Sequence, residues 1–407
     1  MRLTAVLVPK HWYRIGFLAA AGTLAMPAGL SADWPNFRGP RHDGISEETG
    51  FETVWKKPIP MVWEHKIGPA FSSFAVVGDR AFTCGTVDKQ QVILALDANS
   101  GKVLWQKNFE KEYKERMGGD GTRATPTVDG DRVYIVGAKG TLLCLSTADG
   151  KELWRKEFKH EPQWGYSGSV LIEGELAITT GGKSDGALVA FDKKSGAEKW
   201  KAGEDPAGYA TPYPFVFEGK RFVVGFTGTS AIIAEPQTGR VAVRIPWKTD
   251  WEVNAAAPIY HERHLFLTSG YDTGSALYKL RLEGDKLAAE EVWRNKSILA
   301  KFQSAILHQG KLYCSDQKAL VCLDFFDGKE HWRKPRIANG TMVVADNHLM
   351  VLTEKGQLQI AKASPDGYEP LTEAEILSGK CWTVPVLDRG KLYVRDMDRL
   401  ACFDLRK

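Results

Sequence analysis

The 407-residue sequence has few cysteines, little net charge and, beyond its first 32 residues, no long hydrophobic run. None of its six cysteines forms a Cys-x-x-Cys pair, which excludes a zinc site of that kind. The formal charge of +4 falls by three to +1 when the basic residues of positions 1–32 are left out, and so small a charge excludes a typical nucleic-acid-binding surface. Because a spanning helix needs about 20 apolar residues, we expect no transmembrane span in the mature chain.

The most apolar stretch lies at the N-terminus. Residues 1–14 are basic, and the apolar segment Ile15–Leu30 follows them. Leu30-Ser31-Ala32 then provides a small residue before a cleavage point. We expect a secretory signal peptide over residues 1–32, cleaved near Ala32, and a periplasmic or extracellular mature protein. An uncleaved membrane anchor is the alternative.

The main feature of the sequence is a repeat. The segment ILALDANSGKVLW (Ile93–Trp105) joins an apolar run, a turn rich in Asp, Asn, Ser and Gly, and a second strand with a tryptophan. Clear copies are Leu142–Trp154, Leu188–Trp200 and Leu320–Trp332; weaker copies are Ile232–Trp247, Leu277–Trp293 and Leu358–Ile376, and Arg399–Asp404 is a partial copy. Strand-rich repeats of roughly 40–50 residues are typical of propellers.

The eight copies predict an all-β fold: an eight-bladed β-propeller of four-stranded antiparallel blades over residues 62–407. The eighth unit, which ends at Arg399–Asp404, lacks its fourth strand. Val62–Ile67 precedes the first unit and carries a tryptophan where that strand needs one. We therefore expect the N-terminal strand to close the ring, because closure removes the exposed sheet edges of an open array.

Residues 33–61 are predicted to form an N-terminal arm. Prolines and glycines exclude a helix in its first part, DWPNFRGPRHDGIS, while apolar residues such as Trp34 favour burial. The simplest interpretation is an extended arm packed on the propeller surface. In the alternative, the arm plugs one end of the channel and Arg38 and Arg41 contact acidic residues.

A tryptophan ends the last strand of most repeat units. We expect each indole to clamp its blade to the next one and to donate its N–H to a backbone carbonyl. The tryptophans are Trp63, Trp105, Trp154, Trp200, Trp247, Trp293 and Trp332.

Three cysteines occupy one position of the repeat. Cys144, Cys322 and Cys402 fall where other units have Ala95 or Ala190, so we expect buried free thiols in a small apolar site. A disulfide between Cys314 and Cys322 remains an alternative. His261 and His264 fall in a predicted turn and are expected to be solvated, so we predict no metal site.

The repeat resembles a known family. The pattern A-[LF]-D-x-x-[ST]-G-x-x-x-W, present at Ala95–Trp105 and Ala190–Trp200, resembles the pyrroloquinoline-quinone (PQQ) repeat of quinoprotein alcohol dehydrogenases and of the related β-barrel assembly lipoprotein of bacterial outer membranes. The segment DWPNFRGPRHDG also resembles the arm of secreted PQQ-like repeat proteins of planctomycete-type bacteria. The resemblance covers about Trp34 to Lys407 and indicates a fold rather than a function.

The segments that lead into the innermost strands are predicted to form one rim of the central channel. Aromatic rings, one cation and amides occur there, which is a composition typical of ligand pockets. We expect this rim to bind a protein partner or a small ligand; in the alternative, water and the protein's own side chains fill the channel. The candidate residues are Arg123, Trp164, Tyr166, Tyr209, Trp251, Asn254, Gln303 and Trp382.

Three functions are compatible with these residues. We favour a non-catalytic binding or scaffold propeller, expected to be a monomer. A PQQ-dependent dehydrogenase would need a carboxylate base, calcium held by oxygen ligands and, by the resemblance, two adjacent cysteines; no Cys-Cys occurs, and Glu252 is the main acid of the rim segments. A glycan-binding or glycan-cleaving propeller would need two facing carboxylates for hydrolysis. We assign no cofactor, and the resemblance leaves PQQ with calcium open.

Overall fold

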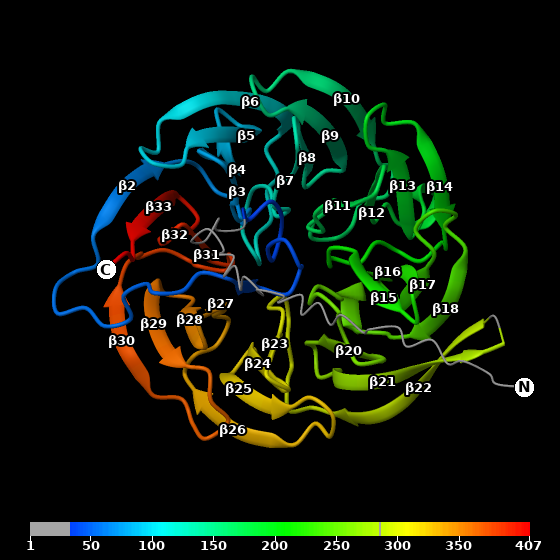
Figure 1. The fold of residues 1–407 in the computed structure, drawn as a ribbon. Coiled ribbons are helices and arrows are strands. Elements are labelled where there is room, and N and C mark those ends of the chain that lie inside the picture. Colours follow the sequence, from blue (N-terminus) through cyan, green and yellow to red (C-terminus); the bar gives the residue numbers. More distant parts are fainter. Residues whose placement is uncertain (1–32, 285) are drawn as a thin grey trace, which may run out of the picture. The chain divides into compact units, whose positions relative to one another are not determined.

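The computed structural model describes residues 33–284 and 286–407. The predicted signal peptide, residues 1–32, lies outside them. The described residues form eight β-sheets arranged as the blades of a ring (Figure 1). This arrangement confirms the predicted all-β, eight-bladed propeller. No helix in the described ranges is long and apolar enough to cross a membrane.

The first four blades follow one another along the chain, and in each the innermost strand comes first. Blade 1 contains β3 (Ala75–Val77), β4 (Arg80–Val87), β5 (Gln90–Asp97) and β6 (Val103–Lys111). Blade 2 contains β7 (Thr127–Asp129), β8 (Arg132–Val136), β9 (Thr141–Ser146) and β10 (Glu152–Glu157). Blade 3 contains β11 (Leu171–Glu173), β12 (Leu176–Thr179), β13 (Leu188–Asp192) and β14 (Glu198–Ala202), with the 3-10 turn η1 (Lys183–Asp185) before β13. Blade 4 contains β15 (Tyr213–Phe217), β16 (Lys220–Phe226), β17 (Ser230–Ala234) and β18 (Val241–Pro246).

The last four blades complete the ring. Blade 5 follows the 3-10 turn η2 (Asp250–Glu252) and contains β19 (Ile259–His261), β20 (His264–Ser269), β21 (Gly274–Glu283) and β22 (Lys286–Asn295). Blade 6 contains β23 (Ile306–His308), β24 (Lys311–Ser315), β25 (Ala319–Asp324) and β26 (Glu330–Pro335). Blade 7 contains β27 (Thr341–Ala345), β28 (His348–Leu352), β29 (Gln357–Lys362) and β30 (Pro370–Glu375). Blade 8 contains β31 (Val386–Asp388), β32 (Lys391–Arg395), β33 (Arg399–Asp404) and, from the N-terminal side of the chain, β2 (Met61–Lys66).

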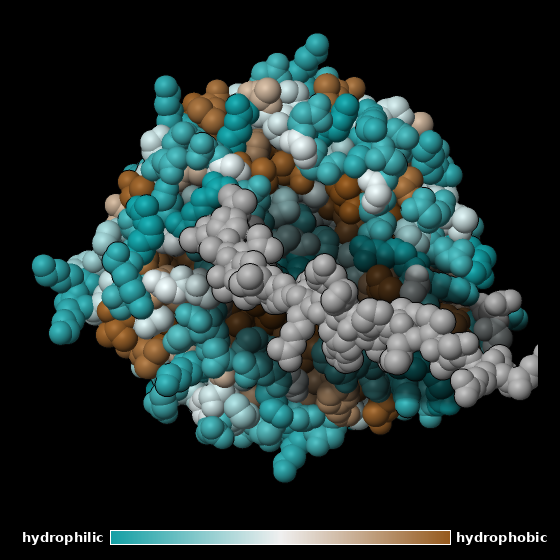
Figure 2. All heavy atoms as spheres, in the orientation of Figure 1, coloured by the Kyte–Doolittle hydropathy of each residue, from teal (hydrophilic) through white to brown (hydrophobic). Residues whose placement is uncertain are grey.

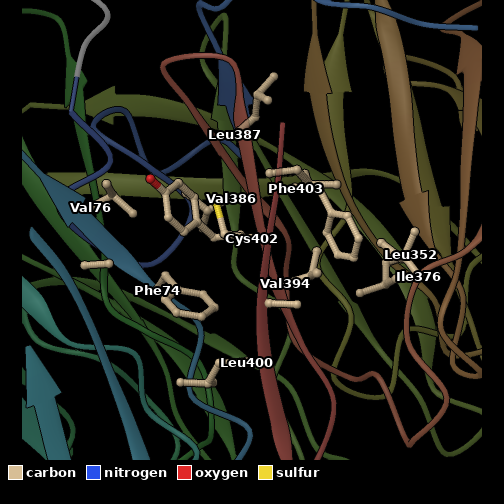
Figure 3. Close-up of a cluster of buried hydrophobic side chains, with 14 of the residues drawn as sticks. Phe74, Val76, Leu352, Ile376, Val386, Leu387, Val394, Leu400, Cys402 and Phe403 are labelled. Atoms are coloured by element: carbon tan, nitrogen blue, oxygen red, sulfur yellow. The ribbon is translucent and has the colours of Figure 1, made fainter. Parts of the chain in front are cut away.

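The ring closes through β2, as the sequence predicts. This strand pairs antiparallel with β33 and supplies the outer strand of blade 8, with Trp63 opposite Cys402. Figure 1 shows β2 and β33 side by side although they come from opposite ends of the propeller sequence. Figure 3 shows the packing at this junction, where Leu400 and Cys402 of blade 8 lie toward Phe74 and Phe403 lies toward Leu352 of blade 7.

The tryptophans at the blade edges join neighbouring blades. Each of six indoles donates its N–H to a backbone carbonyl in the outer turn of the next blade, at distances of 2.8–3.2 Å. The pairs are Trp63 with Ala98, Trp105 with Thr147, Trp154 with Lys193, Trp200 with Pro236, Trp293 with Phe325 and Trp332 with Ser364. Trp247 differs, because its N–H donates to the Ser269 hydroxyl at 3.0 Å.

A glycine in that outer turn makes room for the indole. Gly101 has φ = 70°, and a Cβ added there would lie 2.7 Å from the ring of Trp63. Any larger residue would therefore meet both a left-handed backbone and a steric clash. Gly150, Gly196, Gly239 and Gly328 take the same place against Trp105, Trp154, Trp200 and Trp293.

The outer strands expose the residues on either side of each tryptophan. In β26, Trp332 is half-buried while His331 and Arg333 are exposed, and the outer strands β2, β6, β10 and β14 follow a similar alternation. Hydrophilic residues accordingly cover much of the periphery of the face shown in Figure 2. The core therefore lies between the blades.

All six cysteines are buried free thiols, Cys314 and Cys322 included. Cys322 lies between Tyr313 and Trp332 on its two neighbouring strands, and those rings are 6.0 Å apart. Cys144 and Cys402 occupy equivalent sites between Tyr134 and Trp154 and between Tyr393 and Trp63. Ala95 occupies the same site in blade 1, between Phe82 and Trp105, whereas blade 5 has Leu277 there, between Phe266 and Trp293.

The N-terminal arm crosses the channel, as Figure 1 shows. Its first part bonds to blade 1 at Val76 and to blade 2 at Val128, and its strand β1 (Ile45–Ser46) pairs in parallel with β27 of blade 7. Arg38 donates to the carbonyl of Ala305 in blade 6 at 2.7 Å. The arm therefore follows the plug alternative rather than a purely superficial path.

The acidic contacts expected of the plug are only partly present. Arg38 bonds to backbone carbonyls, including those of His42 and Asp43, instead of to carboxylates. Arg41 does meet acids, but both belong to the arm itself: Asp43 at 2.9 Å and Glu47.

We predict that the indole clamps stabilise the fold individually. Trp200→Phe keeps an aromatic ring but leaves the Pro236 carbonyl without its donor, and we expect a loss of about 1–3 kcal/mol in the free energy of unfolding. Urea denaturation followed by fluorescence measures it. Trp251→Phe is the matched control, because Trp251 is 64% exposed; equal losses in the two variants would contradict the clamp.

A second prediction concerns the buried site of Cys322 between Tyr313 and Trp332. Cys322→Ala should change stability little, whereas Cys322→Phe overpacks the space between two aromatic rings and should cost about 1–3 kcal/mol. Thiol titration should count six cysteines in denaturant and almost none in the native protein. Ready modification of Cys322 in the native state would show that the slot is open.

Candidate functional site

A cavity of about 220 Å³ lies on the propeller axis. Phe37 and Arg38 of the arm line one end of it, close to where the inner strands finish. The opposite end is lined by residues that precede the inner strands, among them Arg123, Trp164 and Trp382. The arm thus converts the channel into a pocket with one mouth.

The structure brings five of the eight predicted residues together. Arg123, Trp164, Tyr209, Gln303 and Trp382 line the cavity.

The other three predicted residues lie elsewhere. Tyr166 is buried between strands and donates to the carbonyl of Gly181 at 2.6 Å. Asn254 is fully buried and holds neighbouring loops together through Thr227 and Ser269. Trp251 is 64% exposed in η2, outside the cavity, with φ = 65°.

Arg123 brings a positive charge to the mouth. Its guanidinium donates to the carbonyls of Gly119, at 2.7 Å, and Gly121, and its centre lies 4.6 Å from the Tyr113 ring centroid and 5.7 Å from that of Phe71. No carboxylate in the described ranges forms an ion pair with it. Burial lowers the pKa of Arg123, although the side chain stays charged at neutral pH. The charge is therefore available to a ligand.

Within the described part of the chain, Glu115 is the carboxylate that lines the cavity, and backbone N–H groups bind it. Glu115 accepts N–H donors from Met117 (2.7 Å), Gly118 and Gly119 (3.3 Å). Burial by itself raises the pKa of Glu115, but these donors and the charge of Arg123 hold the pKa below its ordinary value. Glu115 thus orders the loop at the mouth instead of presenting a free base.

Trp382 forms an aromatic wall on the other side of the mouth. Its ring centroid lies 5.4 Å from that of Phe71 and 4.4 Å from that of Phe302. The indole N–H donates to Glu354 at 2.7 Å, and the Lys380 ammonium lies 4.3 Å from the ring centroid. Four contacts therefore fix the plane of this ring.

One further aromatic pair and one cation–π contact continue the wall. Trp164 and Tyr209 have ring centroids 6.1 Å apart, and the backbone N–H of Trp164 donates to the Tyr209 hydroxyl at 3.4 Å. Burial raises the pKa of Tyr209, so its phenol stays neutral. Lys301 lies 5.4 Å from the Tyr271 ring centroid. Gln303 accepts from Phe302 and donates to Asn339, both at 3.3 Å.

Below the aromatic mouth, hydroxyl groups connect neighbouring blades. The backbone N–H of Ser73 donates to Thr125, that of Thr125 donates to Ser169, and that of Ser169 donates to Thr211, at 2.9–3.1 Å. The N–H of Ala257 donates to Ser304 at 2.9 Å. Small hydroxyl residues thus allow the inner strands to approach the axis and also accept hydrogen bonds from the backbone N–H groups there.

Sequence reasoning missed several lining residues. Phe71 lies in the segment before blade 1 (67–74), Glu115 lies in a long connection, and Tyr271 lies in the long turn of blade 5. For Phe71 and Tyr271, an aromatic residue in a connection on the mouth side was the available signal. That Phe71 stacks on Trp382 depends on ring closure and cannot be read from local sequence.

The sequence also holds one Gly-x-Ser-x-Gly pattern, Gly182–Gly186, which serine hydrolases use at their nucleophile. Here it forms η1 between two strands instead of a strand-to-helix turn. Asp185 accepts the backbone N–H of His160 at 2.9 Å, and no histidine ring in the described part of the chain bonds to Ser184. The pattern therefore builds a turn and no nucleophile.

Eight four-stranded blades with a recurring tryptophan clamp define a PQQ-like repeat propeller. A family model described as outer membrane protein assembly factor BamB matches residues 88–271 and 244–367, more than half of the sequence. The chain belongs to this family. Comparison with curated proteins finds no match.

Solved structures share the fold at low identity. BamB from Moraxella catarrhalis is 14% identical, with a TM-score of 0.60 over 86% of this chain and 98% of that one. A quinohemoprotein alcohol dehydrogenase from Comamonas testosteroni is 12% identical, with a TM-score of 0.65 over 92% and 81%. A europium-containing methanol dehydrogenase is 12% identical, with a TM-score of 0.69 over 90% of each chain.

The cavity fits only part of the cofactor that the resemblance implies. Aromatic walls and the cations Arg38, Arg123 and Lys301 suit the flat, anionic quinone. Calcium needs several oxygen ligands, and Glu115, the carboxylate at the cavity, is held by three backbone N–H groups. Among the described residues no group of three His, Cys, Asp or Glu side chains could hold a metal ion, and Glu252 is exposed outside the cavity. PQQ together with calcium therefore does not fit this site.

We predict that Glu115 controls the order of the mouth loop. Because the folded pKa is lowered, its stabilisation is complete above the pKa of the unfolded chain and is lost as pH falls through the folded pKa. Amide hydrogen-exchange protection of residues 117–119 should therefore be high at neutral pH and should be lost as the pH falls below the ordinary pKa range of a glutamate. Glu115→Gln should show low protection at every pH. Glu112→Gln is the control, and loss of protection in both variants would contradict this role.

Proposed function

We propose that the protein is a non-catalytic binding propeller that presents one mouth of its channel to a ligand or partner. The observation that carries the proposal is the chemistry of the cavity: fixed aromatic walls, cations that form no ion pair with the described residues, and the carboxylate of Glu115, which is already engaged. Such walls and charges bind by stacking and charge-assisted hydrogen bonds. A proton-transfer step would need a free acid or base beside the ligand.

The rim also suits a protein partner. Trp251 is 64% exposed and Met117 is 76% exposed, and both lie in connections on the mouth side of the ring. Exposed tryptophan and methionine side chains are enriched in protein interfaces. Membership of the BamB family supports a scaffold role and, with the N-terminal layout, export to the periplasm or outside the cell.

A PQQ-dependent dehydrogenase is the second candidate, favoured by the fold shared with quinohemoprotein alcohol dehydrogenase and methanol dehydrogenase. The argument against this candidate is that the carboxylate at the cavity, Glu115, already binds backbone N–H groups and is not free to act as a base or a calcium ligand. A glycan-cleaving site meets the same difficulty, because it needs two carboxylates flanking one bond.

A combined assay separates these functions. We expect native mass spectrometry of protein purified from its own host to detect a retained ligand or partner, and Arg123→Ala to lower that retention. Leu153→Ala on the outer edge of blade 2 is the control, because this side chain is exposed away from the mouth.

The same preparation should show no turnover with PQQ, calcium, an artificial electron acceptor and a panel of alcohols and sugars. Turnover under these conditions would contradict the proposal and establish the dehydrogenase.

A further inference from the structure

The hydroxyl groups around the cavity differ in what they do with their protons. Ser73, Ser167, Thr341 and Thr383 donate to backbone carbonyls of neighbouring blades. Their protons are therefore engaged within the fold.

Four other hydroxyls at the cavity have the opposite role. Thr125, Ser169, Thr211 and Ser304 each accept a backbone N–H, and none of them donates to an acceptor in the described part of the chain. All four are at least nine-tenths buried and line the cavity. Because a hydroxyl carries one donor besides its acceptor lone pairs, each has a proton left for a group inside the cavity. We call these four residues the hydroxyl girdle.

Arg38 adds a cation at the closed end. Its Nε and Nη2 atoms donate to the carbonyls of His42, Asp43 and Ala305, and Nη1 has no acceptor among the described residues. Arg38 is 3% exposed and lines the cavity, so its charge is desolvated and close to the ligand space. Buried charges are normally paired; the hydrogen-bond acceptors of Arg38 are backbone carbonyls, and the charge of Asp43 in the arm favours the guanidinium without an ion pair among the described residues.

Four hydroxyl protons and the Nη1 group of Arg38 are thus unused donors at the cavity, as far as the described residues go. From the hydroxyl girdle and Arg38 we infer that the cavity binds a small organic carboxylate without a metal ion: the carboxylate accepts from these donors and a flat apolar body lies between Trp164 and Trp382. The inference rests on the proposed binding function and names its ligand class. It also follows from the misfit with calcium, since fixed cations and hydroxyls take the place of a metal.

Titration calorimetry with naphthalene-2-carboxylate, in buffer containing EDTA, tests this directly. We expect one site per chain and about tenfold weaker binding of naphthalene-2-carboxamide, which has the same rings and no charge. Replacing EDTA with calcium should leave the affinity of the carboxylate unchanged. Equal affinities for the two probes, no binding of either, or binding of the carboxylate only with calcium would each overturn the inference.

Matched variants locate the carboxylate. Ser304→Ala removes a free hydroxyl proton and should weaken binding of the carboxylate about tenfold and binding of the carboxamide by a smaller factor, because a hydrogen bond to a charged acceptor is stronger. Ser167→Ala removes a hydroxyl that lines the same cavity but donates to Tyr209, and should change neither affinity. Each variant leaves one backbone group without a partner, so their effects on folding are similar.

If Ser304→Ala does not fold, Thr211→Val and Thr383→Val make the same comparison with isosteric side chains. Identical effects of the two members of a pair would overturn the girdle. The result also separates this inference from the proposed function: equal binding of both probes overturns the ligand class alone, whereas turnover with PQQ and calcium overturns the binding function.

Discussion

The structure depends on the bond between each blade-edge tryptophan and the outer turn of the next blade. A single blade buries too little surface to be stable, so each must present an apolar face to two neighbours. The indole covers that face, and its N–H fixes the register to one carbonyl, as in Trp105 with Thr147. Trp63 repeats this contact from the N-terminal strand, so the same bond that joins the blades also closes the ring.

Closure determines what is found on the axis. Eight inner strands can approach one another only if small residues precede them, and serine and threonine combine small size with hydrogen-bonding capacity. Where a hydroxyl donates its proton to the next blade, as Ser167 does, it only joins the blades. Where a hydroxyl accepts a backbone N–H instead, as Ser169 does, its own proton remains available to a ligand in the channel. The packing of the ring thus creates a polar lining that the arm then encloses at one end.

The repeat made most of the fold predictable. Eight copies, the missing strand of blade 8 and the tryptophan in Val62–Ile67 each had a local signature, and all three agree with the structure. The cysteine slot was predictable for the same reason, because position in a repeat implies position in space.

The site was less predictable because it combines connections from different blades. Arg123 and Trp382 stood out by residue type. Tyr166 and Asn254 are aromatic and amide residues of the same rim segments, yet they are buried and hold neighbouring loops and strands together. Which rim residue faces inward depends on loop conformation, and the repeat does not specify it. Likewise, the difference between Ser167 and Ser169 lies in the direction of one hydrogen bond, which no sequence pattern records.

The central claim is that the channel is a metal-free binding pocket for an anion. A crystal structure with 6-bromonaphthalene-2-carboxylate tests it most directly, since the anomalous signal of bromine fixes the orientation of the ligand. The account predicts bromine at the mouth near Trp164 and Trp382, with the carboxylate within hydrogen-bond distance of Arg38 and the hydroxyl girdle. A ligand bound in the reverse orientation, or on the outer blade surface, would contradict it.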